Sequence, residues 1–132
     1  MKKRIVLILI LIFASCNNVS SNRYISITDI SLIKEKKFII FFYTDTCKAC
    51  NDALDIMERR YKNKKYQGFF VNIDTKETTI SQEKISNINK RKDEEISLYS
   101  FPYLLYFNEN IVVKEVYGYT NILKENLYIF FE

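Results

Sequence analysis

The chain has 132 residues, of which 48% are apolar and 27% charged, so it suits one globular domain and is unlike a disordered segment. Its formal charge of +4 depends on Lys2, Lys3 and Arg4, and the basic and acidic residues after them nearly balance. This balance predicts no basic surface for a nucleic acid.

The first 15 residues have the three parts of an export signal. A basic start precedes an apolar run over residues 5–13, and the small residues Ala14 and Ser15 follow it. The apolar run is about half of the roughly 20 residues that a bilayer-spanning helix needs. We therefore predict that residues 1–15 are a signal peptide and not a permanent membrane span.

Cys16 directly follows these small residues, and the arrangement resembles a bacterial lipoprotein signal. The resemblance implies that Cys16 is acylated and becomes the new N-terminus, although Phe13 stands where such signals most often have Leu. The alternative is a plain secretory signal in which Cys16 has no role. Residues 16–23 are polar and are predicted to be a tether, which would anchor an extracytoplasmic domain to the periplasmic or cell-surface side of a bacterial membrane.

The folded part is expected to begin at residue 24. A short alternating stretch opens residues 24–37, and Thr28 or Asp29 then provides an N-cap for a helix that ends in two lysines. Residues 38–43 form a continuous apolar run rich in β-branched and aromatic side chains. This run predicts a strand that is buried on both faces.

Cys47 and Cys50 follow this strand. A tetrahedral zinc site needs four ligands, and the chain has no histidine and no second cysteine pair. A copper site is disfavoured because only Met1 and Met57 would offer thioether sulfur. A disulfide that closes so small a loop would stabilise the fold little. The spacing therefore favours a reactive dithiol over a metal site or a structural bridge.

From Cys47 the pattern becomes helical, with Leu54, Met57 and Tyr61 on one face. Residues 69–74 predict a second buried strand. In the polar stretch 75–98 the spacing of Ile80, Ile85 and Ile88 indicates one longer or broken helix.

Two strands at the C-terminal side predict an antiparallel hairpin, at residues 103–107 and 111–117 with a turn at the sequence NEN. After Gly118 the spacing of apolar residues predicts a single amphipathic helix with Thr120 as its cap. Helices between apolar strands favour an α/β fold with a parallel core and an antiparallel edge.

These motifs, in this order, resemble the thioredoxin family over residues 24–132. A buried strand leads into Cys-x-x-Cys at a helix start, a second strand follows, and a proline precedes the hairpin and the last helix. The resemblance implies a thioredoxin-like domain whose central mixed sheet, with a parallel core and an antiparallel C-terminal hairpin, is flanked by helices.

Pro102 is the only proline in the chain. It stands where the thioredoxin family has its cis-proline, and the resemblance implies that Phe101 and Pro102 flank the two sulfur atoms and that the Phe101 backbone pairs with an extended substrate. From the residues alone, a trans-proline that opens an edge strand is an alternative.

The two cysteines take distinct roles by the same resemblance. Cys47, at a helix N-terminus that favours the thiolate, would be the nucleophile, and Cys50 would resolve the mixed disulfide. Lys48 is placed to stabilise the Cys47 thiolate, or is a solvated surface lysine. Asp45 is a candidate for proton transfer, or an exposed loop acid. Apart from this redox-active pair no cofactor is implied.

Three residues depart from the family pattern. Phe41 stands where thioredoxins have a buried acid, Phe70 where they have the lysine that partners it, and Thr46 where they have tryptophan. These departures leave two functions open. The first is a membrane-anchored thiol–disulfide oxidoreductase that acts on exported proteins and exchanges electrons with a membrane donor or acceptor. The second is a surface lipoprotein that uses the fold as a binding module.

Overall fold

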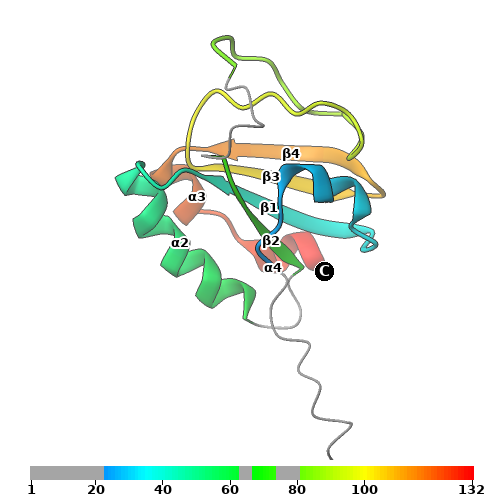
Figure 1. Cartoon of the computed structure of the whole chain (residues 1–132). Helices are drawn as coiled ribbons and strands as arrows, with labels where there is room; N and C mark the ends of the chain where they lie inside the picture. Colours follow the sequence, from blue (N-terminus) through cyan, green and yellow to red (C-terminus); the bar gives the residue numbers. More distant parts are fainter. Residues whose placement is uncertain (1–22, 63–66, 74–80) are drawn as a thin grey trace, which may run out of the picture.

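The fold consists of one sheet with helices packed against it (Figure 1). The computed structural model describes residues 23–62, 67–73 and 81–132. In chain order the elements are the 3₁₀ helix η1 (Ile27–Leu32), β1 (Lys37–Tyr43), α2 (Lys48–Tyr61), β2 (Gly68–Asn72), β3 (Tyr103–Asn108), β4 (Ile111–Tyr117), α3 (Tyr119–Leu123) and α4 (Leu127–Phe131).

The four strands lie in the order β2-β1-β3-β4. β1 is parallel to β2 and antiparallel to β3, and β3 is antiparallel to β4. Tyr24 adds an isolated parallel bridge to Phe70 at the outer side of β2. The predicted α/β class, with a parallel pair and an antiparallel C-terminal hairpin, is confirmed, and the topology is compatible with a thioredoxin-like fold.

β1 lies at the centre of the sheet and is buried on both faces, as its apolar sequence predicts. On one face Phe41 belongs to a cluster with Met57 of α2. On the other face Ile40 belongs to a cluster with Ile30 of η1 and Leu98 of the long segment before β3. The predicted helix after Cys47 is also confirmed, and α2 turns Cys50, Ala53, Met57 and Tyr61 toward the sheet.

The helix predicted within residues 24–37 is wrong in its cap and its end. Ser26 precedes η1, and its backbone carbonyl accepts from the Asp29 N–H at 3.0 Å, while the Ser26 N–H donates to the Asp29 carboxylate at 3.3 Å. The N-cap is therefore Ser26, not Thr28 or Asp29, and Asp29 takes part from the third position of the helix. η1 ends at Leu32, because the next residue, Ile33, is extended; its N–H donates to the Ile30 carbonyl at 3.2 Å.

The helix predicted over residues 75–98 is wrong where the structure describes it. Residues 81–98 contain no helix, and Ile85 and Ile88 are 44% and 38% exposed. Ile96 and Leu98 are buried near the end of this segment, and its buried polar side chain is that of Asn87. Its side-chain amide donates to the Ser97 carbonyl at 2.8 Å, and its side-chain oxygen accepts from the Ser97 N–H at 2.8 Å. These bonds pair the polar groups of the Asn87 side chain with the Ser97 backbone, so they hold the segment folded back on itself as a loop and not as a helix. Ile80 lies outside the described residues.

Glu115 on β4 connects this loop to the sheet. Its carboxylate accepts from the Tyr103 hydroxyl at 2.7 Å, the Ser86 hydroxyl at 2.8 Å and the Asn87 N–H at 3.0 Å. Burial acts to raise the pKa of Glu115, but the hydrogen bonds outweigh burial and the pKa is lowered from its ordinary value. The ionised carboxylate therefore stabilises the folded loop.

Replacing Glu115 with glutamine should lower the free energy of unfolding at pH 7 by about 1.5–3 kcal/mol, the usual range for hydrogen bonds to a charged group. Because the folded pKa lies below the unfolded one, the contribution of Glu115 is complete above the unfolded pKa and is lost as the pH falls through the folded pKa. Urea unfolding at neutral and acid pH should therefore show a smaller acid loss in Glu115→Gln than in the native protein. Glu109→Gln, at an exposed turn position, is the control. Equal acid loss in Glu115→Gln and the native protein would contradict the assignment.

The predicted hairpin is confirmed. Its turn residues Glu109 and Asn110 have φ values of 51° and 67°, and positive φ at both central positions is what a type I′ hairpin turn requires. Asparagine adopts this conformation more readily than most residues, which is why the sequence NEN signals the turn.

The single C-terminal helix that the sequence predicts is wrong, because the chain forms two short helices. The Arg60 guanidinium donates to the Leu123 carbonyl at 3.0 Å and to the Glu125 carbonyl at 3.4 Å, which ties down the end of α3. The Asn126 side chain accepts from the Tyr128 N–H at 3.1 Å and begins α4. Thr120 is not the cap and lies inside α3.

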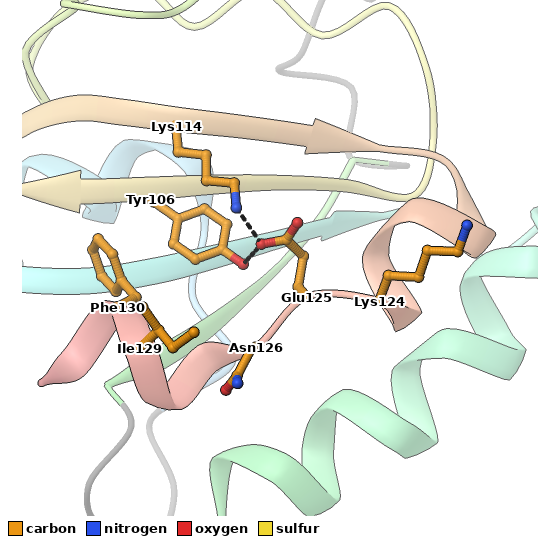
Figure 2. Close-up of a pocket in the computed structure, with 7 residues that line it drawn as sticks. All are labelled: Tyr106, Lys114, Lys124, Glu125, Asn126, Ile129 and Phe130. Carbon is orange, nitrogen blue, oxygen red and sulfur yellow. Dashed lines mark hydrogen bonds and ion pairs between the residues drawn. The ribbon is translucent and has the colours of Figure 1, made fainter.

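A hollow with a volume of about 290 Å³ lies beside this turn (Figure 2). The Glu125 carboxylate accepts from the Tyr106 hydroxyl at 2.8 Å and from the Lys114 ammonium at 2.6 Å. Figure 2 shows these groups together, with α4 along one side of the hollow. The bonds fix the turn between α3 and α4 to the sheet and so determine where α4 lies.

Gly68 begins β2 directly against the ring of Tyr61. A Cβ atom at Gly68 would lie 2.3 Å from that buried ring, which is closer than atoms can approach. Gly68→Ala should therefore lower the free energy of unfolding by about 1–3 kcal/mol, the usual cost of overpacking a core. Chemical denaturation would measure it.

The control is a double-mutant cycle with Tyr61→Leu, which removes the ring. Gly68→Ala should cost less in that background. An unchanged cost would show that contact with Tyr61 is not the cause.

Candidate active site

The two cysteines lie where β1 ends and α2 begins. After β1 the chain turns, with the Cys47 N–H donating to the Thr44 carbonyl at 3.3 Å, and Cys47 becomes the N-cap of α2. Cys47 is half-buried and Cys50, in the first turn of α2, has no exposed surface. The sulfur atoms lie at disulfide distance and the Cα atoms are 5.2 Å apart. The pair is thus compatible with redox chemistry.

The start of α2 gives Cys47 an environment that favours negative charge. The Cys50 N–H donates to the Cys47 sulfur at 3.0 Å, so one of the unpaired amides of the helix start is directed at this atom. The positive end of the helix dipole lies at the same place. Both effects stabilise a thiolate more than a neutral thiol, which suits a nucleophile that attacks a disulfide.

Phe41 and Phe70, two of the three departures from the thioredoxin pattern, contact each other. They are register partners on β1 and β2, and their ring centroids lie 6.0 Å apart with the ring planes at 71°. Both belong to the core cluster that contains Cys50. Among the described residues the buried polar side chains are those of Thr44 and Asn87, and neither is charged. An aromatic pair therefore occupies the place that an acid and a lysine take in that pattern.

The Phe101–Pro102 peptide is cis. Pro102 directly precedes Tyr103, which pairs with Phe42 near the end of β1, so Pro102 lies at the same end of the sheet as Cys47. The Pro102 carbonyl accepts from the Gly118 N–H at 3.0 Å. Phe101 is half-buried and packs against the core clusters on both faces of the sheet. The sheet thus brings the two predicted substrate-contacting residues to the end where the cysteines lie.

Asp45 and Lys48 are both exposed beside the cysteines. The Asp45 carboxylate accepts from the Asn72 side-chain amide, with both oxygens at 3.1 Å. Asn72 was not among the residues that the sequence indicated. It ends β2, and the parallel register places it beside Tyr43 at the end of β1, so it lies next to the loop that carries Asp45. Polar residues at the carboxyl ends of neighbouring parallel strands are the signal that would have identified Asn72.

The described residues contain no group of three or more histidine, cysteine or acidic side chains that could hold a metal ion. Within the same residues no helix is long and apolar enough to cross a bilayer. Cys16 and the predicted signal peptide lie outside the described ranges. Comparison of the chain with protein-family models and with curated proteins gave no match.

Proposed function

We propose that this protein is a membrane-anchored, extracytoplasmic thiol–disulfide oxidoreductase that acts on exported proteins. The observation that carries the proposal is the position of Cys47, half-buried at the start of α2, with the Cys50 N–H directed at its sulfur and the Cys50 sulfur at disulfide distance. The export signal and Cys16 in the sequence support the location, with Cys16 as the acylated residue.

In the reducing direction, the Cys47 thiolate attacks one sulfur of a substrate disulfide. A mixed disulfide forms, and the other substrate sulfur leaves as a thiolate that takes up a proton. Cys50 then loses its proton and attacks the Cys47 sulfur, which releases the second substrate thiol and leaves the Cys47–Cys50 disulfide. The substrate gains two electrons and the protein loses two, and the oxidising direction is the reverse.

Other residues at this end of the sheet would bind the substrate, stabilise the Cys47 thiolate and transfer protons. The Phe101 backbone would pair with an extended substrate segment beside Pro102, and Lys48 would add positive charge near the Cys47 thiolate. Asp45, held by Asn72, would accept or return a proton at the edge of the site. A membrane electron donor or acceptor would restore the pair after each turnover.

A binding module with the same fold and idle cysteines is the second candidate. The Phe41–Phe70 pair favours it, because no charged side chain is buried in the described core near Cys50 to move a proton. Fold alone does not decide between turnover and binding.

Equilibration of the purified protein with glutathione tests the proposal. A Cys47–Cys50 reduction potential near about −270 mV would indicate a reductase, and one near about −120 mV a disulfide donor. Rapid alkylation of reduced Cys47 below neutral pH is expected in either case, because the helix start favours the thiolate. A pair that neither equilibrates with glutathione nor reacts below neutral pH would favour the binding module.

A further inference from the structure

The end of the domain opposite the cysteines combines exposed apolar and basic side chains. Leu32 and Ile129 are 70% and 69% exposed, the highest values among the large apolar side chains of the described residues. Lys34 and Lys36 are exposed as well. We call these four residues the basal surface.

The basal surface has two parts, one from η1 and the residues that follow it and one from α4, and both lie at the start of β1. η1 leads through Lys34 and Lys36 directly into this strand. The Lys37 ammonium donates to the Phe130 carbonyl at 3.4 Å, which holds α4 at the same point. β1 then runs away from this end toward the cysteine motif, and Figure 1 shows η1 at the opposite end of the sheet from the start of α2.

Charge differs between the two ends along α2. Asp52 and Asp55 outnumber Lys48 in the half of this helix near the cysteines. At its other end Arg59 and Arg60 of the last turn, with the C-cap Lys62, outnumber Glu58. Around the basal surface Lys34, Lys36 and Lys37 are matched in number by Glu35, Glu109 and Glu132, so the positive excess of this end comes from the cations at the end of α2. An anionic surface would therefore attract the basal end and repel the cysteine end.

The chain also enters the domain from the basal direction. The Phe70 N–H donates to the Arg23 carbonyl at 2.6 Å, and the Ile25 N–H donates to the Phe70 carbonyl at 2.9 Å. This segment runs parallel to β2 and so enters from the end where β2 begins. The chain between Cys16 and Arg23 spans at most about 25 Å when fully extended. An acylated Cys16 would therefore hold the basal end within reach of the bilayer.

From these observations we propose that the basal surface docks on an anionic phospholipid bilayer, so that Cys47 and Cys50 face away from the membrane. This inference rests on the lipid anchor of the proposed function. Leu32 and Ile129 enter the boundary between headgroups and acyl chains, while Lys34 and Lys36 contact headgroup phosphates. The orientation leaves the redox pair open to exported proteins.

Tryptophan fluorescence tests the orientation, because the chain contains no tryptophan. The Ile129→Trp variant places a single fluorophore at the basal surface. The Asp52→Trp variant places a single fluorophore at the cysteine end. The full chain is acylated in a bacterial host and reconstituted into vesicles that contain phosphatidylglycerol and brominated acyl chains, which quench nearby tryptophan. We expect the Ile129→Trp variant to lose emission and shift to shorter wavelength, and the Asp52→Trp variant to do neither.

Charge reversal tests the lysines. In the Ile129→Trp background, Lys36→Glu should reduce the quenching, and Lys124→Glu, at an exposed lysine outside the basal surface, should leave it unchanged. Stronger quenching of the Asp52→Trp variant, or equal quenching of both variants, would overturn the proposed orientation. Absence of quenching in both would indicate a protein partner or a second copy of the chain, and would overturn the bilayer as the occupant.

Two further readouts separate this inference from the proposed function. Mass spectrometry of the N-terminal peptide shows whether Cys16 is acylated, and glutathione exchange shows whether the redox pair is active. If Cys16 is not acylated, the same vesicles are added in excess to the unacylated protein. Selective quenching of the Ile129→Trp variant would then support the basal surface although the anchor has failed, and no quenching would overturn it.

Discussion

The Cys47→Ser variant should show no thiol–disulfide exchange above the rate of the reagents alone. A serine hydroxyl remains protonated at neutral pH and forms no mixed disulfide, so the Cys50 N–H that stabilises the Cys47 sulfur would have no nucleophile to act on. Reduction of a model protein disulfide, followed with time, measures the loss. The substitution is nearly isosteric, so the folded structure should be kept.

Cys50→Ser is the matched control, because it removes the other sulfur of the pair. Cys50 has no exposed surface, so in the proposed mechanism it reacts only after Cys47 has bound the substrate. The variant should therefore accumulate a covalent mixed disulfide through Cys47, visible by mass spectrometry under non-reducing conditions. Exchange activity that survives in Cys47→Ser, or trapping through Cys50 in that variant, would refute the assigned roles.

Phe41→Asp should strongly destabilise the protein, and more so at neutral than at acid pH. Loss of the buried ring costs about 3–5 kcal/mol by itself. The new carboxyl would lie in the apolar cluster that contains Cys50, where burial favours its neutral form and raises its pKa above the unfolded value. The folded state then binds more protons than the unfolded state between these two pKa values, so stability falls as the pH rises through them. Urea unfolding at acid and neutral pH would measure both effects.

Two variants separate the causes. Phe41→Leu removes ring volume without adding charge, so its cost should not depend on pH. Phe41→Asp combined with Phe70→Lys places opposite charges at partner positions of β1 and β2, and should recover part of the loss at neutral pH. A Phe41→Asp protein that is equally stable at acid and neutral pH would show that the introduced carboxyl is not buried.

The same double variant bears on the chemistry. A carboxylate in the Cys50 cluster would provide a proton acceptor that the aromatic pair does not, and the release of mixed disulfides should become faster in the folded fraction. Stopped-flow measurement of the release step at equal concentrations of folded protein would detect the change.

The parts of the fold that the sequence predicted are those with strong local signals. The apolar run of β1 indicates burial on both faces. The sequence NEN between two apolar runs indicates the β3–β4 hairpin, and its turn residues adopt left-handed φ values. The segment over residues 81–98 was misassigned because its conformation depends on Asn87 and Glu115, which are far apart in the chain and meet only in the folded protein. Likewise, the break between α3 and α4 depends on Arg60 of α2.

The candidate site divides in the same way. Cys47, Cys50 and Pro102 were found from their spacing and order, and the sheet places them at one end. Asn72 was missed because its contact with Asp45 requires the register of β1 and β2, which the sequence does not specify. The contact between Phe41 and Phe70 also follows from that register. In the sequence each of them is one of many apolar aromatic residues, and nothing there marks them as a pair.

The irregular segment before β3 has a consequence for how molecules of this protein behave when they are crowded. Asn89 donates its N–H to the Val112 carbonyl at 2.9 Å, and Val112 donates to the Lys90 carbonyl at 2.8 Å. The Lys92 N–H donates to the Asn110 carbonyl at 2.9 Å. Val112 near the start of β4, the last strand of the sheet, and Asn110 of the preceding turn thus have these outward backbone groups already paired. A neighbouring chain cannot add a strand there, so this segment protects the protein from sheet-to-sheet aggregation where many copies share a small volume.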